Sequence, residues 1–98
     1  MKDLFKKLDK AFENKIRLGI MSVLVVHRQV AFNDLKEMLE LTDGNLASHL
    51  KYLEKENYIS VTKSFVNRKP NTLYAATPAG VSAFEIHLNA LEELLKKM

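Results

Sequence analysis

Cysteine and tryptophan are absent from this 98-residue chain, and glycine and proline are scarce, at three and two residues. Without cysteine there is no disulfide, no thiolate metal ligand and no cysteine nucleophile. The shortage of helix breakers, with 47% hydrophobic and 28% charged residues, is typical of a folded, helix-rich chain. Because one domain takes about 100 residues or more, we expect residues 1–98 to form a single domain.

Long apolar segments are also lacking. The longest mainly apolar run extends from Leu18 to Val26, which is about half of the length that a membrane-spanning helix needs. The first ten residues mix acids with bases and do not resemble a signal peptide. We therefore expect a cytoplasmic protein without contact to a membrane.

Positive charge is in modest excess, at +3, and it is concentrated in two places. Residues 1–28 carry seven bases against three acids. Residues 62–77 carry three bases, Lys63, Arg68 and Lys69, and no acid. The position of this charge is more informative than its sum, because a local group of bases attracts an anionic partner.

Hydrophobic periodicity predicts helices in the first half of the chain. A short amphipathic helix is expected over residues 4–12, and a central buried helix from about Asn14 to His27. After a short extended stretch at residues 30–32, Asn33 is expected to cap a helix that ends near Leu41. The apolar faces of these three helices are formed by Leu4, Phe5, Leu8 and Phe12, by Ile16, Ile20, Val23 and Leu24, and by Leu35, Met38 and Leu39.

The second half begins with a further helix, which Thr42 caps and which runs to about Asn57 with Leu46, Leu50 and Leu53 on one face. A turn of three or four residues separates it from the preceding helix, which is helix-turn-helix spacing. Alternating residues then predict a hairpin with strands at 59–65 and 73–76, joined by a turn at 69–72 with Pro70 at its second position. Thr77 and Pro78 start a last helix that runs nearly to Met98.

These elements predict a mainly α fold with a small β-hairpin, in the winged helix-turn-helix order α-α-β-α-α-β-β-α. The segment LTDGNLASHLKYLEKENYISVTKSFVNRKPNTLYAATPAG, together with flanking residues from about 14 to 95, resembles the small stand-alone winged-helix transcriptional regulators of the MarR and ArsR groups. The resemblance implies a sequence-specific regulator that binds double-stranded DNA, with repression as the favoured mode. The alternative is a winged-helix module that binds a protein and not DNA.

The helix at about 42–57 is the expected recognition helix. If its leucines face the core, Gly44, Ser48, Lys51 and Lys55 face solvent, with Asn45 and Tyr52 on one shoulder. Amide, hydroxyl, phenol and ammonium groups match the base edges and phosphates of a major groove. We expect Asn45 and Ser48 to contact bases and Lys51 and Tyr52 to contact the backbone, with an ordinary solvated helix face as the alternative.

The wing, at about residues 63–72, is the second expected contact. Lys63, Asn67, Arg68 and Lys69 are expected to reach phosphates or a narrow minor groove. Protection of an edge strand by its charges is the alternative. Thr42 offers a third contact, because a helix N-terminus presents N–H groups to a phosphate, although capping is its more usual role.

The terminal helices are expected to form a homodimer. Apolar side chains at three and four spacing follow the last helix from Val81 to Met98, and the helix at 4–12 also has an apolar face to cover. The dimer residues we expect are Leu4, Phe5, Leu8, Phe84, Leu88, Leu91 and Leu95. In the resembling families such helices form a symmetric dimer; the alternative is that both fold back on their own domain.

Chemical sites are not predicted. His27 and His49 adjoin apolar runs, and Glu85 and His87 begin a metal-sensor pattern that no second histidine completes. No phosphate-binding glycine loop or nucleophile motif is present, so we expect no enzyme activity, no cofactor and no metal. A small-molecule effector is left open.

Overall fold

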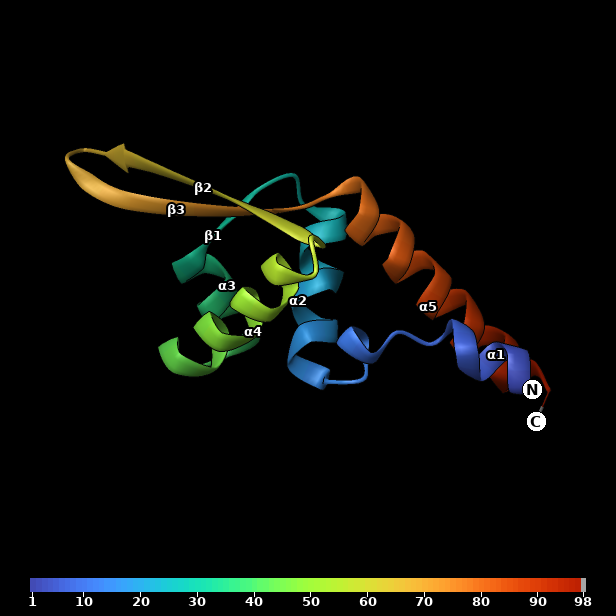
Figure 1. The fold of residues 1–98 in the computed structure, drawn as a ribbon. Coiled ribbons are helices and arrows are strands. Elements are labelled where there is room, and N and C mark those ends of the chain that lie inside the picture. The colour runs from blue at the N-terminus through green and yellow to red at the C-terminus, as the bar shows by residue number, and fades with distance from the viewer. Residues whose placement is uncertain (98) are drawn as a thin grey trace.

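The computed structural model describes residues 1–97 and confirms the predicted winged-helix architecture (Figure 1). Only Met98, the last of the apolar residues expected along the C-terminal helix, lies outside the described residues. The elements are α1 (Lys2–Lys7), the 3-10 helix η1 (Lys10–Phe12), α2 (Lys15–Val26), β1 (Val30–Ala31), α3 (Phe32–Leu39), α4 (Asp43–Lys55), β2 (Ile59–Val66), β3 (Lys69–Ala76) and α5 (Pro78–Lys96). The three strands form one antiparallel sheet in the order β1-β3-β2.

The core surrounds α2, as the width of its apolar stripe predicts. Ile20, Met21 and Leu24 of α2 are at most 3% exposed. The leucines of α4 that were predicted to face inward, Leu46, Leu50 and Leu53, are equally buried. Burial of one face of α4 in this core turns its opposite face to solvent, which positions the candidate site.

Three helices begin where a side-chain oxygen replaces a missing backbone partner. The Oδ1 atom of Asn14 accepts hydrogen bonds from the backbone N–H groups of Ile16 and Arg17, at 2.9 and 3.1 Å. The hydroxyls of Thr42 and Thr77 accept from backbone N–H groups three residues later, at 3.2 and 2.9 Å. These starts of α2, α4 and α5 agree with the sequence prediction.

The predicted helix over residues 4–12 is wrong. The chain leaves the helical conformation after Lys7, Leu8 is extended, and a separate 3-10 turn follows. Asp9 causes the break, because its carboxylate caps the N–H of Ala11 at 2.9 Å while its own N–H donates to Nδ1 of His87 at 2.9 Å. As a result Phe12 is buried in the core, 2% exposed, and is not on a terminal-helix face.

Two predictions for the third helix are also wrong. The residue before α3 is Ala31, which makes no side-chain cap bond, so Asn33 lies inside the helix and does not cap it. Met38 is 54% exposed, although Leu35 is fully buried. The helix has only eight residues and ends at Leu39, because the next residue, Glu40, has a left-handed φ of 52°. The core therefore covers just a narrow part of its apolar face.

The hairpin turn differs from the prediction as well. Asn67 and Arg68 form the turn, with φ of 53° and 67°, and Val66 pairs with Lys69. Two left-handed central residues define a type I′ turn, whose twist matches that of the flanking strands. Pro70 therefore lies in β3, opposite Phe65. This pair is the one next to the hydrogen-bonded pair at the turn, where the missing N–H of proline points away from β2.

The molecule is elongated, with extents of 53 × 25 × 21 Å. The β2–β3 wing projects at one end, and α5 runs to the other end, where α1 packs beside it (Figure 1). Within residues 1–97, no helix combines the length and the apolar character that crossing a membrane requires.

Candidate nucleic-acid interface

The outer face of α4 carries small and polar side chains, as predicted. Asn45, Ser48, Lys51 and Lys55 are exposed. The Ser48 hydroxyl donates to the backbone carbonyl of Asn45 at 3.3 Å, which leaves its lone pairs free to accept. A helix face of this kind presents donors and acceptors without bulky groups that would keep it away from a surface.

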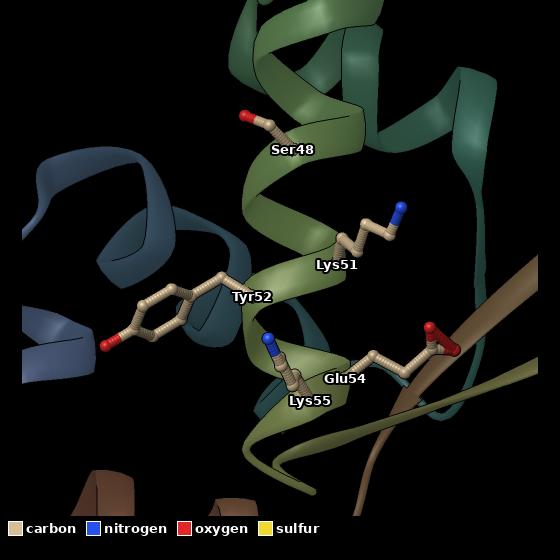
Figure 2. A pocket seen from close by; sticks show the side chains of 5 residues that line it. All are labelled: Ser48, Lys51, Tyr52, Glu54 and Lys55. Carbon is tan, nitrogen blue, oxygen red and sulfur yellow. The ribbon is translucent and has the colours of Figure 1, made fainter.

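A shallow hollow of about 600 Å³ lies over the second half of this face (Figure 2). Figure 2 shows Lys51 and Glu54 on one side of α4 and Tyr52 pointing to the other side, toward the N-terminal segments. Tyr52 is half-buried. The structure thus separates Tyr52 from Lys51, although sequence spacing placed both among the backbone contacts.

A groove separates α4 from the wing. It has a volume of about 210 Å³, and its walls include Ala47, Lys51 and Glu54 from α4 and Val61 and Lys63 from β2. The two lysines face it from opposite elements, and Glu54 adds an acid on the α4 wall, so the wing wall is the more positive of the two. A phosphate backbone that followed this groove would contact the recognition helix and the wing at the same time.

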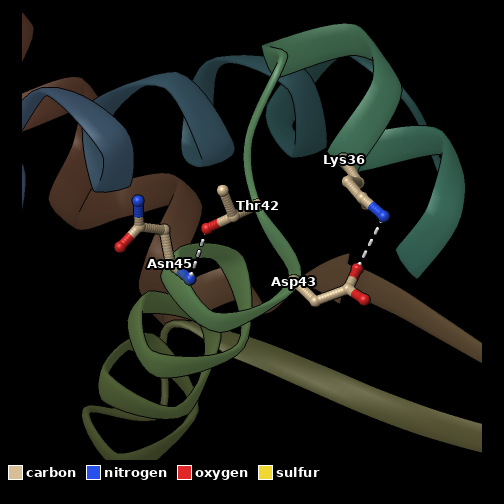
Figure 3. A network of polar contacts seen from close by, with 4 residues as sticks. All are labelled: Lys36, Thr42, Asp43 and Asn45. Atoms are coloured by element: carbon tan, nitrogen blue, oxygen red, sulfur yellow. Dashed lines mark hydrogen bonds and ion pairs between the residues drawn. The ribbon is translucent and has the colours of Figure 1, made fainter.

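The N-terminus of α4 is built by two polar contacts (Figure 3). Thr42 caps the helix through Asn45 N–H, and Lys36 of α3 pairs with Asp43 at 2.8 Å. Both members of this ion pair are exposed, so it adds little stability. It does offset the acidic side chain that would otherwise repel a phosphate approaching the free N–H groups of the first turn.

The wing tip carries the predicted basic residues. Lys63, Asn67, Arg68 and Lys69 are all exposed. Arg68 occupies a left-handed position at which glycine is the preferred residue, because a side chain there crowds the following carbonyl. A strained arginine at the most projecting point of the chain is consistent with a binding role.

Arg17, which the sequence prediction did not include, joins the recognition helix to the rest of the fold. Its guanidinium carbon lies 3.9 Å from the centre of the Tyr52 ring, and Nη1 lies 3.3 Å from Nδ1 of His49. Its Nε donates to the carbonyl of Ala11 at 2.7 Å. One side chain therefore holds two residues of α4 against the N-terminal turn. The sequence signal that could have identified Arg17 was a charged residue within the apolar helix predicted at 14–27.

The charge of Arg17 also affects His49. Burial of the imidazole and, to a smaller extent, the nearby guanidinium lower the pKa of His49 below its usual 6.5. The lowered pKa of His49 favours the neutral ring at pH 7.

Asp9 links α5 to the base of the wing. Its Oδ2 accepts a hydrogen bond of 2.5 Å from the hydroxyl of Tyr58, while its N–H is bound to His87 on α5. The bond to the carboxylate raises the pKa of Tyr58 to about 12, with burial as the next cause. His87, 3% exposed, thus has a structural contact. Within residues 1–97, no three His, Asp or Glu side chains are placed to hold a metal ion.

The residues expected to form a dimer divide into two groups. Leu4 and Phe84 are buried within their own chain, with the Phe84 ring edge-on to Phe12 at 5.2 Å, and Leu8 is half-buried. These three contact their own fold in the single chain. The residues that remain open are Phe5, Leu88, Leu91 and Leu95, at 61, 42, 37 and 69% exposure.

A helix-turn-helix with an exposed polar recognition face and a basic wing defines a winged-helix DNA-binding protein. The chain belongs to the winged helix DNA-binding domain family, which it matches over residues 16–95. A relative with 35% identity is the uncharacterized protein MJ0432 of Methanocaldococcus jannaschii, aligned over 91% of this chain and 97% of the relative.

Solved structures share the whole fold. The transcriptional regulator homologue protein from Pyrococcus horikoshii OT3 is 30% identical, with a TM-score of 0.90, and the match covers 99% of this chain and 97% of that one. MepR of S. aureus, in its complex with DNA, is 17% identical, with a TM-score of 0.74 over 98% of this chain and 82% of MepR.

These matches confirm the predicted resemblance. The protein is a DNA-binding transcription regulator of the winged-helix class. They favour DNA binding over the alternative of a protein-interaction module, for which the matched family and these relatives give no support.

Proposed function

We propose that the protein is a homodimeric repressor that binds a pseudo-palindromic duplex, with α4 in the major groove and the wing on the flanking backbone or minor groove. An α-helix with side chains is about 10–12 Å across and fits the B-DNA major groove, about 12 Å wide. The observation that carries the proposal is the groove between α4 and the wing, which has Lys51 and Lys63 on its two walls. Residues 57–84, which include the whole wing, contain no acid.

In this proposal Asn45 and Ser48 contact base edges. Both are exposed on the first two turns of α4, the part of a recognition helix that lies deepest in the groove. An asparagine amide can bind both N6 and N7 of adenine, and a hydroxyl can donate or accept. Lys51 and Tyr52 contact the backbone on either side of the helix, and Thr42 presents the helix N-terminus to a phosphate.

The wing residues bind without reading sequence. Lys63, Arg68 and Lys69 neutralise phosphates or line a minor groove, and Asn67 forms the turn that presents them. Neutralised phosphates release counterions, so the wing contributes to the salt dependence of binding.

The dimer forms through the open apolar side chains of the terminal helices, which are Phe5, Leu88, Leu91 and Leu95. A twofold axis there leaves both wings and both α4 helices free, because they lie toward the opposite end of the chain (Figure 1). Two recognition helices then enter successive major grooves about 34 Å apart. A regulator of this kind acts in the cytoplasm, by binding and not by catalysis.

Titration of labelled duplexes at two salt concentrations tests these assignments. The specific duplex is selected with the protein from a random pool, and a scrambled duplex serves as reference. Asn45→Ala should lose about 1–3 kcal/mol of binding free energy on the selected duplex alone. Lys69→Ala should weaken both duplexes and flatten the salt slope by about one.

Lys2→Ala is the matched control, because Lys2 is an exposed lysine of α1 at the far end of the molecule. We expect it to leave the salt slope unchanged. Equal losses on selected and scrambled duplexes for Asn45→Ala would contradict base reading, and an unchanged slope for Lys69→Ala would contradict the wing contact.

A further inference from the structure

An aromatic side chain stands unburied on the wing. Phe65 is 75% exposed, more than any other large apolar side chain of residues 1–97 except Val26, and its neighbour Val66 is 52% exposed. β2 is an edge strand of the sheet. Exposed apolar residues on an edge strand favour aggregation, and edges usually carry charges instead. The exposure of Phe65 therefore makes the free chain more prone to aggregation, because folding leaves this side chain unburied.

The strand register shows which way Phe65 faces. Side chains alternate along β2, and Ile59 and Val61 face the core, so Lys63 and Phe65 continue the same face. This is the face that borders the groove next to α4. Pro70 lies directly opposite Phe65 in β3, on the same face. Val66 points to the other side of the hairpin.

A second copy of the chain does not cover this residue in the proposed dimer. The wing projects at one end of a molecule 53 Å long, and the terminal helices with their exposed leucines meet at the other end (Figure 1). The occupant of the Phe65 surface must therefore come from elsewhere.

The charges around Phe65 identify that occupant. The bases nearest to it along the hairpin are Lys63, Arg68 and Lys69, and the acid-free stretch 57–84 surrounds them. An apolar group on a hairpin that carries three bases and no acid fits a polyanion that also offers apolar atoms. The minor groove of DNA has this character, because deoxyribose rings form its walls between two rows of phosphates.

We propose that Phe65, with Pro70 beside it, packs into the minor groove that flanks the α4 site and partly unstacks one base step there. The basic residues around it bind the phosphates on both sides of the groove. A pyrimidine–purine step yields most easily to such an insertion, so the wing adds sequence preference through DNA deformability and not through hydrogen bonds to bases. This inference rests on the proposed function and extends it to the wing.

The test compares Phe65→Ala with Val66→Ala on a duplex of about 30 base pairs selected with the wild-type protein. These variants shorten neighbouring apolar side chains of one strand that face opposite ways. We expect Phe65→Ala to lose about tenfold in affinity with the salt slope unchanged, because an apolar contact releases no counterions. Val66→Ala should stay within about twofold.

A fluorescent base analogue gives an independent readout. 2-Aminopurine, placed at successive positions beside the site, brightens when it is unstacked. Wild-type protein should increase its fluorescence at one flanking step, and Phe65→Ala should not. Phe65→Thr keeps a strand-favouring residue and should behave like Phe65→Ala, which shows that the loss is not due to a disordered hairpin. Thermal unfolding should be the same for all these proteins, since both side chains are exposed.

The outcomes separate the two proposals. If the wild-type protein binds no duplex, the proposed function fails together with the inference. If the wild-type protein binds and Phe65→Ala binds equally well, the insertion alone is overturned. The insertion is also overturned if Phe65→Ala loses affinity but the wild-type complex shows no change in fluorescence. Equal losses for Phe65→Ala and Val66→Ala would also overturn it, because they would show no preference for one face of the wing.

Discussion

The two ends of the molecule both expose large apolar side chains, but the charges around them differ. At the wing, Phe65 lies on a hairpin that carries three bases and no acid. On α5, the exposed Leu91 and Leu95 lie among Glu92, Glu93 and Lys96, so acids and bases are mixed there. A surface with one sign of charge repels its own copy, whereas a balanced surface can meet itself across a twofold axis.

The comparison shows that exposure alone does not identify a partner. Similar apolar areas suit a polyanion at one end and a second protein chain at the other, and the surrounding charges make the difference. The following changes test each end and the junction between them.

The junction should be the most sensitive position. Gly80 lies where α5 meets the base of the hairpin, and a Cβ there would collide with the backbone carbonyl of Tyr58. Gly80→Ala should lower the free energy of unfolding by about 3 kcal/mol or more, because backbone atoms cannot move aside. Denaturant unfolding measures this. Gly44→Ala is the control, since no atom lies within 4 Å of a Cβ there, and it should change stability by about 1 kcal/mol or less. Equal effects at both glycines would contradict the close packing.

Substitutions at the α5 end should have the second-largest effect. Leu88→Glu combined with Leu91→Glu places charge on exposed positions, so the single chain should still fold. The chain should sediment as a monomer and bind the selected duplex about 100-fold more weakly, because the second half-site no longer benefits from linkage. Ser82→Glu adds an acid at another exposed position of α5 and should leave the dimer intact. A double variant that remains dimeric would place the interface elsewhere.

The wing should show a conflict between stability and binding. Arg68→Gly relieves a left-handed residue and should raise the free energy of unfolding by about 1 kcal/mol. The same change should weaken DNA binding and flatten the salt slope by about one. Asn57→Gly changes another left-handed residue, φ 62°, away from the wing tip, and should leave binding unchanged. A glycine variant that binds as tightly as wild type would remove Arg68 from the contact.

The smallest expected effect is on pH dependence. The folded-state pKa of His49 lies below its unfolded value, so its contribution to stability is present above the unfolded pKa and is lost as pH falls through the folded pKa. Arg17→Met removes the neighbouring charge and should raise the His49 pKa toward 6.5, as measured by NMR titration of the ring. Lys15→Met is the control, because Lys15 is an exposed lysine of the same helix, two positions before Arg17. An unchanged His49 pKa in Arg17→Met would mean that burial alone lowers it.

Local signals predicted much of the fold. Thr42 and Thr77 were recognised as caps because a cap depends on residues only two or three positions away. The spacing of Leu46, Leu50 and Leu53 predicted the buried face of α4, and therefore the exposed face that carries Asn45 and Ser48. The roles of these residues in binding remain predictions, and so do those of the basic wing residues.

The errors occurred where contacts distant in sequence decided the outcome. Residues 4–12 have a helical pattern, yet Asp9 breaks the helix because its partners, Tyr58 and His87, come from the turn before β2 and from α5. Pro70 suggested a turn, but strand pairing placed the turn at residues 67–68. Arg17 was missed because its partners Tyr52 and His49 lie more than 30 positions away.

The sequence by itself determined the element order, the helix starts, the basic wing and the winged-helix class, because caps, periodicity and charge act over a few neighbouring residues. Only the tertiary structure decided that Leu4 and Phe84 are buried in their own chain while Leu88 and Leu95 stay open, and that Phe65 is left exposed on the wing. Such differences depend on which elements pack together, and the same apolar pattern along a helix or strand is compatible with either outcome.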